Sequence, residues 1–406
     1  MQDQDYTPVL RFAVCSDVHI RQADDLYCAR LRAQMRCVYA IAAADDNYKK
    51  VDAFLIAGDA TERGEPEQYA AFAECVRAEL RGDTQMRAVV AKNHDNWTGA
   101  GKDGLDFYRE ATGNPTDFHL CLNGFHFLGV STCGAAGEYY APEQREWLSA
   151  ELQSCAAEDR VKPIFVLHHE HVKDTVWGST DTDGWGIAYF KDIFVQYPQI
   201  EHLSGHSHYP LNDPRSVYQR EFTAIGTGAL SYAELTVDGQ NKIRPADKGE
   251  INEGWIVEVD AQNRIRLRGF DYLTNTQIAF YLLDSPADKT RYTLTPEQQQ
   301  ARSGAPVFPQ GVSLCCALTE DSVYVTVPRA ESTDGFPVVL YRAWIEDEDG
   351  RKTARAYTIP PYWYENRIPA YTIRLPKPKG FFTVHAVAEN AYGMTSDALH
   401  CAVSEA

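Results

Sequence analysis

Six short apolar runs in the first part of the chain constrain its fold more than any other feature. They are rich in Val, Ile, Leu and Phe and occupy residues 9–15, 53–57, 88–91, 125–130, 164–167 and 200–203. Continuous apolar runs of this length are typical of strands that are buried on both faces. Helical patterns separate some of the runs, at residues 25–44, 67–80 and 142–152. This alternation predicts a layered α/β domain.

The pattern changes from about residue 250 onward. Residues 312–406 alternate apolar and polar positions, as in SVYVTVP and YTIRLP, with turns such as KPKG between them. This alternation predicts a smaller, all-β sandwich of antiparallel strands. The intervening segment is polar and rich in Pro and Gln, with a short helix expected at Pro296. We therefore predict a first domain over residues 1–288, a linker over 289–311 and a second domain over 312–406.

Charge and composition exclude several classes of protein. The formal net charge of −18 argues against a nucleic-acid partner, because such proteins carry a basic surface. No apolar run reaches the roughly 18 residues that a membrane span needs, so no membrane partner is expected. The ten cysteines form no CxxC pair, and the N-terminal sequence has no visible signal peptide. Reduced thiols in a cytoplasmic protein are expected, and a secreted, disulfide-bonded protein is the alternative.

Polar side chains follow five of the six apolar runs directly. They are Asp17 and His19, then Asp59, then Asn93, His94 and Asp95, then His168, His169 and His171, and finally His206 and His208. In an open α/β sheet, the carboxyl ends of the strands form the ligand-binding crevice. The sequence therefore predicts that these imidazoles, carboxylates and the amide gather at one place.

Imidazole, carboxylate and amide oxygen together suit borderline metals such as Zn, Mn, Fe or Co. No cysteine joins the set, which argues against a closed structural zinc site. The number of donors exceeds one tetrahedral shell, so two metals sharing a carboxylate are the economical arrangement, and such sites serve in-line displacement at phosphorus. Each motif alone also fits an ordinary turn or helix cap. Their joint occurrence in order is what turns and caps fail to explain.

The ordered set DxH, GDxxE, NHD, H and GHxH resembles the calcineurin-like metallophosphoesterase superfamily, over about residues 9–285. The segment GDATERG is similar to the corresponding loop of cyclic-nucleotide and glycerophosphodiester phosphodiesterases. Glu62 stands where purple acid phosphatases have tyrosine, which argues against a purple iron site. The resemblance implies a four-layer α/β/β/α sandwich. The C-terminal strands, in turn, resemble a fibronectin type III-like β-sandwich.

The resemblance also implies a site with two divalent or trivalent metal ions. One metal is bound by Asp17, His19 and His208, the other by Asn93, His168 and His206, and Asp59 bridges them. A hydroxide held between the metals attacks phosphorus. His94 then stabilises the transition state or protonates the leaving oxygen, and Asp95 orients His94. Lys92 replaces the family's usual glycine, which puts the shape of that loop in doubt.

Residues 171–186 and 208–219 follow ligand positions and are expected to shape the substrate pocket. The candidates for substrate contact are Arg215, Tyr209, Trp177 and His171. Arg215 suits a phosphate oxygen, and the aromatic rings suit a base or sugar. A turn around Arg215 and ordinary packing of the rings are the alternatives. His169 is expected to be exposed.

These features predict a phosphoester hydrolase that acts on a small-molecule diester. A phosphomonoesterase is the first alternative. The alternative of another class is a non-catalytic scaffold with the same fold, which would be expected to lose ligands or His94. All of these residues are present, so the enzyme is favoured. The β-sandwich domain has no catalytic set, and it is expected to border the pocket or to form a homodimer.

Overall fold

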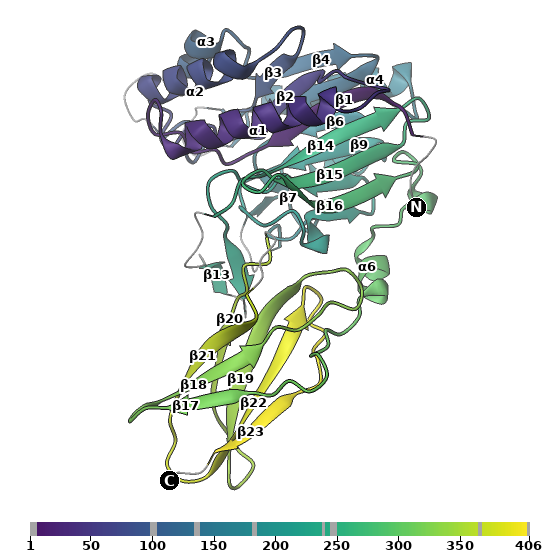
Figure 1. The fold of residues 1–406 in the computed structure, drawn as a ribbon. Helices are drawn as coiled ribbons and strands as arrows, with labels where there is room; N and C mark the ends of the chain where they lie inside the picture. The colour runs from purple at the N-terminus through teal and green to yellow at the C-terminus, as the bar shows by residue number, and fades with distance from the viewer. Residues whose placement is uncertain are drawn as a thin grey trace. The chain divides into compact units, whose positions relative to one another are not determined.

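The chain folds into two compact units, each described here by itself. The computed structural model describes residues 6–97, 104–133, 139–180, 185–237, 240–243, 250–363 and 368–403 (Figure 1). Unit 1 comprises Met1–Leu211 and Arg215–Pro296, and unit 2 comprises Asn212–Pro214 and Glu297–Ala406. Among the helices of the described residues, none is long and apolar enough to cross a membrane.

Unit 1 contains two six-stranded sheets, and the first has the order β16-β15-β14-β1-β2-β3. Its strands are β1 (Pro8–Cys15), β2 (Ala53–Ile56), β3 (Gln85–Ala88), β14 (Glu253–Asp260), β15 (Ile265–Asp271) and β16 (Thr276–Leu283). Strands β1, β2 and β3 are parallel, whereas β14, β15 and β16 add antiparallel strands beyond β1. The carboxyl ends of β1, β2 and β3 therefore lie at the same edge of this sheet.

The second sheet has the order β10-β11-β9-β6-β5-β4. Its strands are β4 (Phe118–Leu122), β5 (Phe125–Gly129), β6 (Ile164–Leu167), β9 (Ile200–Ser204), β10 (Val217–Gln219) and β11 (Thr223–Gly226). Strands β5, β6, β9 and β11 are parallel, and an antiparallel strand lies at each edge. Asn123 and Gly124 join β4 to β5 with positive φ at both residues, the backbone that a two-residue hairpin turn favours.

Two helical layers enclose the pair of sheets. Helices α1 (Leu26–Ala43), α2 (Pro66–Glu79) and α3 (Gly104–Thr112) pack on the first sheet (Figure 1). Helices α4 (Pro142–Glu158) and α5 (Lys191–Phe194) pack on the second. The sequence predicted α1, α2 and the start of α4 but did not predict α3. The order of layers is α/β/β/α, so the predicted metallophosphoesterase sandwich is confirmed.

Strand β1 is apolar except for Arg11, which is buried and paired with Glu258 at 2.7 Å. Leu10, Phe12 and Val14 point into the core between the two sheets, whereas Ala13 and Cys15 point toward the helices. The ring of Phe12 makes edge contacts with two phenylalanines of the second sheet, at centroid distances of 5.1 and 4.8 Å. Both faces of the strand are buried, so neither face tolerates a polar alternation.

Several short elements lie outside the two large sheets and their helical layers. They are β7 (His171–Val172), β8 (Gly186–Ile187), β12 (Leu235–Val237), β13 (Gln240–Ile243), η1 (Pro214–Ser216), η2 (Lys289–Arg291) and α6 (Pro296–Arg302). Strands β7 and β8 form a two-stranded parallel sheet, and β12 and β13 an antiparallel one. The short helix predicted at Pro296 is present as α6.

Unit 2 is an antiparallel β-sandwich of two sheets, as the alternating pattern predicted. One sheet has the order β17-β18-β21 and the other β20-β19-β22-β23. The strands are β17 (Cys315–Leu318), β18 (Ser322–Pro328), β19 (Val338–Asp347), β20 (Lys352–Thr358), β21 (Ala370–Pro376), β22 (Phe382–Asn390) and β23 (Leu399–Val403). Val323, Val325 and Val327 of β18 face Val384 and Ala386 of β22 across a shared core. The likeness to a fibronectin type III module stays a prediction.

Candidate metal centre

The polar motifs that follow the apolar runs meet at the carboxyl ends of the strands of both sheets. Asp17 and His19 follow β1 of the first sheet, Asp59 follows β2 and Asn93 follows β3. His169 follows β6 of the second sheet, and His206 and His208 follow β9. No single strand–helix unit contains the whole set. The site is therefore assembled by the packing of one sheet on the other.

Four buried side chains, Asp17, His19, Asp59 and His208, form the first group of possible metal ligands. His208 Nε2 lies 3.1 Å from Asp17 Oδ1 and 3.3 Å from His19 Nε2. His19 Nε2 lies 3.9 Å from Asp59 Oδ2. These separations suit ligands that surround one ion, because each atom can reach a shared centre.

A second group contains Asp59, His169 and His206, with Asn93 beside them. His169 Nε2 lies 3.2 Å from Asp59 Oδ2 and 3.1 Å from His206 Nδ1. Asn93 Nδ2 lies 3.2 Å from Asp59 Oδ2 and 3.4 Å from His206 Nδ1. Asp59 belongs to both groups, and this is the geometry expected of a carboxylate shared by two ions.

The structure corrects the sequence-based choice between two adjacent histidines. His168 was expected in the second group, but its ring lies among Tyr140, Phe190 and His202, with a centroid distance of 4.1 Å to His202. His169 was expected to be exposed, yet it is 1% exposed and takes the place assigned to His168. His169 Nδ1 donates to the carbonyl of Ala57 (2.8 Å), which leaves Nε2 to face Asp59 and His206.

The donor set fits metal ions. Within the described part of the chain, Asp59 Oδ1 and Asn93 Oδ1 are buried and have no hydrogen-bond partner. Most buried polar atoms in folded proteins are paired, so two unpaired oxygens at one place call for a partner such as a cation. Imidazole, carboxylate and amide donors suit borderline transition metals, as the sequence predicted.

The charges of the site point the same way. Burial alone would raise the pKa of Asp59, but the imidazoles of His169, His19 and His94 hold it at about 2. Burial likewise opposes ionisation of Asp17, and His208 with His169 outweighs it, so the pKa of Asp17 lies well below its usual range. Both carboxylates are thus ionised at neutral pH. In the metal-free protein, protonated imidazoles balance the negative charge of Asp17 and Asp59. Bound cations would supply that positive charge instead, and the imidazoles would lose their protons.

The backbone at these positions is unusual. Asp17, His19, Asp59, His206 and His208 all have positive φ, between 52° and 73°. Non-glycine residues rarely adopt this region, and each instance costs on the order of 1–3 kcal/mol. Strained residues of this kind concentrate at functional sites, where the surrounding fold holds them in place.

Two glycines make room for the site. A Cβ atom added at Gly58 would lie 2.3 Å from His169 Nδ1, and Gly58 has a φ of +91°. A Cβ at Gly205 would lie 2.4 Å from Ser16 Oγ and 2.6 Å from Asp17 Oδ2. The glycines in the GD and GHSH motifs therefore allow close approach between loops that follow different strands.

His94 lies beside the first group. Its ring makes an edge contact with His19 at a centroid distance of 4.4 Å. His94 Nδ1 donates to the carbonyl of Glu62 at 2.9 Å. The Glu62 side chain in turn accepts from His19 Nδ1, with 3.2 Å between the atoms. Glu62 therefore orients both histidines, one through its backbone and one through its carboxylate.

The prediction that Asp95 orients His94 is wrong in this structure. Asp95 is fully buried and accepts hydrogen bonds from Thr61 N (2.8 Å), Thr61 Oγ1 (2.9 Å) and Ala91 N (3.2 Å). Burial, with the nearby charge of Asp59, raises the pKa of Asp95 to about 6. Asp95 thus ties its own loop to the loop after β2, and the Glu62 carbonyl orients His94 instead.

The structure places the four residues predicted to contact substrate outside the two ligand groups. His171 is buried between Ser204 Oγ (2.8 Å) and Ser207 Oγ (2.7 Å). The Trp177 ring packs on Tyr209 at 4.2 Å, and the Arg215 guanidinium stacks on Trp177 at 3.8 Å. These contacts favour packing for Trp177 and Tyr209 and a turn at Arg215, which lies in η1, and substrate contact by the four residues stays a prediction.

Two side chains at the site, Glu62 and Tyr232, were not singled out as site residues from sequence. Glu62 was noted only as a departure from purple acid phosphatases, and it contacts His19. Trp185 makes an edge contact with His206 at 4.7 Å, and Tyr232 stacks on His208 at 4.2 Å. The Tyr232 carbonyl also accepts from His208 Nδ1 (2.9 Å). Lys92 places its Nζ 4.8 Å from the ring centre of Tyr139.

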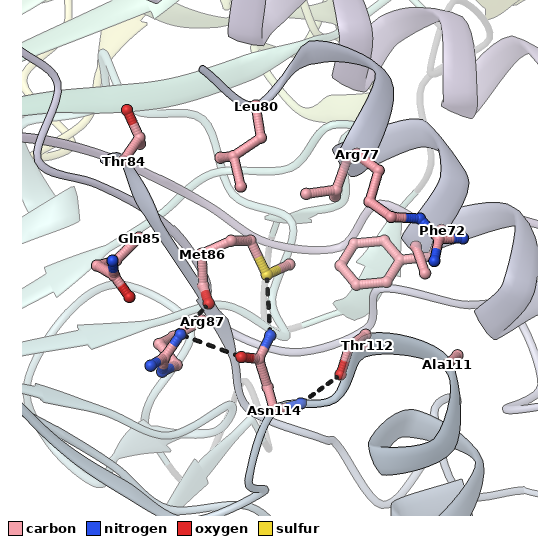
Figure 2. Close-up of a pocket in the computed structure, with 12 residues that line it drawn as sticks. Phe72, Arg77, Leu80, Thr84, Gln85, Met86, Arg87, Ala111, Thr112 and Asn114 are labelled. Carbon is pink, nitrogen blue, oxygen red and sulfur yellow. Dashed lines mark hydrogen bonds between the residues drawn. The ribbon is translucent and has the colours of Figure 1, made fainter. Parts of the chain in front are cut away.

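A pocket of about 290 Å³ lies elsewhere in unit 1, between α2, β3 and the end of α3 (Figure 2). Figure 2 shows the hydrogen bond that Arg87 donates to Asn114, and Phe72 and Met86 contribute apolar surface to the pocket. It contains no member of the two ligand groups and no cluster of titratable side chains that could perform acid–base chemistry. The chemistry of the described residues therefore lies at the strand ends and not in this pocket.

Comparison with known proteins agrees with the site. Residues 10–210 match the family described as calcineurin-like phosphoesterase. A probable cyclic nucleotide phosphodiesterase of Rhodococcus erythropolis is 29% identical over 168 residues, which cover 39% of this chain and 51% of that protein. The chain thus spans about half the length of this curated relative.

Two solved structures illustrate the range of similar folds. GAP50, the anchor in the inner membrane complex of Plasmodium, is 15% identical with a TM-score of 0.45, over 69% of this chain and 91% of that chain. Purple acid phosphatase PPD1 from yellow lupin is 13% identical with a TM-score of 0.44, over 68% of this chain and 54% of that chain. The match of residues 10–210, together with the four layers and the clustered Asp and His residues, identifies a calcineurin-like phosphoesterase domain in unit 1.

Proposed function

We propose that this protein is a dinuclear metal-dependent hydrolase that cleaves a small-molecule phosphodiester. The observation that carries the proposal is the position of Asp59, which lies within 3.9 Å of His19 in one ligand group and 3.2 Å of His169 in the other. A shared carboxylate between two sets of imidazoles is the arrangement of two-metal hydrolases.

The two groups divide the ligands between two ions. Asp17, His19, Asp59 and His208 would hold the first, and Asp59, Asn93, His169 and His206 the second. When bound, the two cations would polarise the phosphoryl group and lower the pKa of a water molecule between them. The chain itself contributes fixed positions, because strained backbone and close loop contacts hold the ligands before any ion arrives.

His94 is the candidate proton donor. Its Nδ1–H is committed to the Glu62 carbonyl (2.9 Å), so Nε2 is the ring nitrogen that can face a substrate. A protonated ring would donate from Nε2 to the oxygen that leaves phosphorus. Neutral His94 would still offer a hydrogen bond acceptor there but would not supply the proton.

The substrate class rests on two supports. The net charge of −18 opposes the approach of a nucleic-acid polyanion, so a small molecule is favoured. The loop GDATERG and the 29% identical relative, a probable cyclic nucleotide phosphodiesterase, favour a diester over a monoester. A non-catalytic scaffold of the same fold is the rival from another class.

The test combines metal analysis with two chromogenic substrates, bis-p-nitrophenyl phosphate and p-nitrophenyl phosphate. We expect bound transition metal in the wild-type protein and faster turnover of the diester. Asn93→Ala should lose metal and activity together, whereas His94→Ala should keep its metal and lose turnover by about 10²–10⁴-fold. Absence of metal together with inactivity on both substrates would overturn the proposal in favour of a scaffold. Faster turnover of the monoester would overturn the diester assignment alone.

A further inference from the structure

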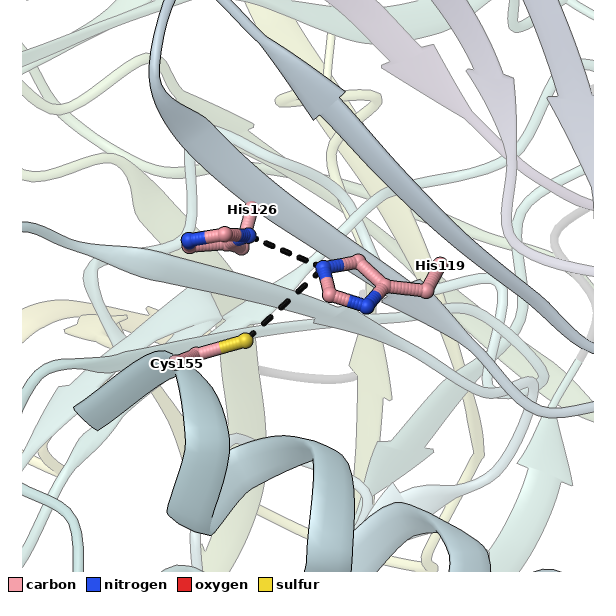
Figure 3. A group of neighbouring side chains, drawn as sticks. All are labelled: His119, His126 and Cys155. Atoms are coloured by element: carbon pink, nitrogen blue, oxygen red, sulfur yellow. Dashed lines mark hydrogen bonds between the residues drawn. The ribbon is translucent and has the colours of Figure 1, made fainter. Parts of the chain in front are cut away.

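A second cluster of metal-binding side chains lies between the β4–β5 hairpin and helix α4. It consists of His119 on β4, His126 on β5 and Cys155 near the end of α4 (Figure 3). None of the three belongs to the ligand groups at the strand ends, and none has a part in the proposed hydrolysis. The hairpin register pairs Cys121 with His126, so His119 and His126 lie diagonally on one face of the hairpin.

The three donor atoms converge on one point. His119 Nε2 lies 2.9 Å from His126 Nδ1 and 3.8 Å from Cys155 Sγ (Figure 3). Tetrahedral zinc with bonds of about 2.0 Å to nitrogen and 2.3 Å to sulfur separates two nitrogens by about 3.3 Å, and nitrogen from sulfur by about 3.6 Å. The observed separations differ from these by only a few tenths of an ångström, which side-chain rotation can supply.

The outer nitrogen of each imidazole has a carboxylate partner. His119 Nδ1 lies 2.7 Å from Glu151 Oε2, and His126 Nε2 lies 3.4 Å from Glu158 Oε2. Glu151, Cys155 and Glu158 are spaced by four and three residues, so they share one face of α4. A carboxylate on the far nitrogen fixes the ring and raises its basicity, and this is the usual second partner of a metal-bound histidine.

We propose that His119, His126 and Cys155 bind a divalent transition-metal cation of the Zn²⁺ class, at a site separate from the catalytic centre. A donor set of two imidazoles and one thiolate binds Zn²⁺ in preference to Mg²⁺ or Ca²⁺, which favour oxygen ligands. The fourth position is open to water or to a nearby carboxylate. The bound ion would tie the C-terminal turn of α4 to the edge hairpin of the second sheet.

Access from solvent suits such a site, and binding must displace a proton from the Cys155 thiol. The His119 side chain is 30% exposed, so an ion can enter from solvent, whereas Cys155 is 2% exposed and lies at the base. Burial first, and the Glu151 and Glu158 charges second, raise the pKa of Cys155 to about 11. The thiol is therefore protonated before the ion arrives, and coordination displaces that proton.

Co²⁺ distinguishes this site from the catalytic centre, because only this one has a cysteine ligand. Titration of the full chain, first stripped of metal, should produce a near-ultraviolet thiolate-to-Co²⁺ charge-transfer band whose final intensity corresponds to one Co²⁺ per chain, while up to two further equivalents bind at the catalytic centre without adding to it. Cys155→Ser should abolish the band, and His119→Ala and His126→Ala should each weaken Co²⁺ binding at this site by roughly tenfold or more. Cys37→Ser removes a half-buried thiol of α1 and is the matched control, which should keep the band.

Thermal unfolding gives an independent readout. Zn²⁺ should raise the Tm of the wild-type protein and of Cys37→Ser by more than it raises the Tm of His119→Ala, whose exposed side chain makes misfolding of the variant a minor concern. All three variants of the cluster should retain diester hydrolysis, so failure here is distinguishable from failure of the proposed function. Absence of the band at excess Co²⁺, or a band that persists in Cys155→Ser, would overturn the proposal.

Discussion

His169 Nε2 lies 3.2 Å from Asp59 Oδ2, while the preceding residue, His168, turns its ring into an aromatic core. Burial lowers the pKa of His168 to about 3, so its ring is neutral. Both of its nitrogens lack a hydrogen-bond partner among the residues that the structure describes. Two adjacent histidines thus have opposite environments, and substitution should separate them.

We expect His169→Ala to lose more activity than the roughly 10–100-fold that is typical of removing an outer partner of a metal ligand. His168→Phe should retain diesterase activity, because a phenyl ring suits the neighbouring Tyr140 and Phe190. Replacing an unpaired buried polar ring should also raise the free energy of unfolding by roughly 1 kcal/mol. Steady-state kinetics and urea unfolding measure both. Equal loss of activity in the two variants would contradict the assignment.

Glu62 should act through His19. Its carboxylate accepts from His19 Nδ1 at 3.2 Å, so Glu62→Gln weakens the partner that orients a proposed ligand. We expect a roughly 10–100-fold loss of metal affinity, with turnover largely recovered at saturating metal. Activity measured against free Mn²⁺ or Zn²⁺ concentration tests this. An unchanged metal dependence would show that Glu62 does not support the site.

Gly58 should be far less tolerant of a side chain than other glycines with positive φ. Gly58→Ala places a Cβ 2.3 Å from His169 Nδ1, so it should displace that ring and abolish most activity. Gly82→Ala is the matched control, since Gly82 has a φ of +55° and nothing lies within 4 Å of an added Cβ. The control should cost about 1–2 kcal/mol of stability and leave turnover unchanged. Similar activities for the two variants would argue against the close approach.

Asp95 should give the metal-free protein a recognisable pH dependence. Burial and Asp59 raise its pKa to about 6 in the folded state, whereas an unfolded aspartate has a pKa of about 3.9. Between these values the folded state binds more protons, so the contribution of Asp95 to stability falls as pH rises through this window. Asp95→Asn should remove this slope.

The measurement is urea unfolding of chelator-treated wild type and Asp95→Asn across that pH window. The difference between the two free energies of unfolding should change with pH, because histidines common to both proteins contribute equally. A constant difference would mean that Asp95 is not perturbed. Metal-loaded protein should show a weaker effect, since cations near Asp59 offset the charge that raises the pKa of Asp95.

The positions of most site residues follow from the sequence because these residues come directly after strands that the sequence predicts. Parallel strands such as β1 and β2 end at one edge, so the prediction of a parallel sheet was enough to place Asp17 and Asp59 together. The alternation of β18 likewise predicted which valines face the core of unit 2. In both cases, a periodic pattern over several residues determines the outcome.

The choice between His168 and His169 depends on which face of β6 each side chain lies on, because adjacent residues of a strand point to opposite faces. Ile164 and Val166 of β6 face α4 and α5, whereas Phe165 and Leu167 face the other sheet. Continued alternation places His168 on the helix side and His169 on the inter-sheet side. The alternation is present in the sequence, but it selects His169 only when the face of β6 that packs on the other sheet is known.

The remaining errors concern contacts between distant loops. The sequence does not reveal that Thr61 donates a hydrogen bond to the carboxylate of Asp95. Nor does it reveal that His94 donates to the carbonyl of Glu62. For Arg215 the sequence left a phosphate contact and a turn as alternatives, and the structure places it in the turn η1, stacked on Trp177. Such contacts depend on loop conformations, including the positive φ values at the site, that no short sequence pattern specifies.

The division of ligands between two sheets determines when the centre can form during synthesis. Asp17, Asp59 and Asn93 leave the ribosome early, but His206 and His208 follow β9, more than a hundred residues later along the chain. A nascent chain cannot complete either ligand group until β9 has paired with β6. Binding of the cations therefore requires the second sheet to have formed as far as β9, and a truncated product that lacks β9 would carry no functional centre.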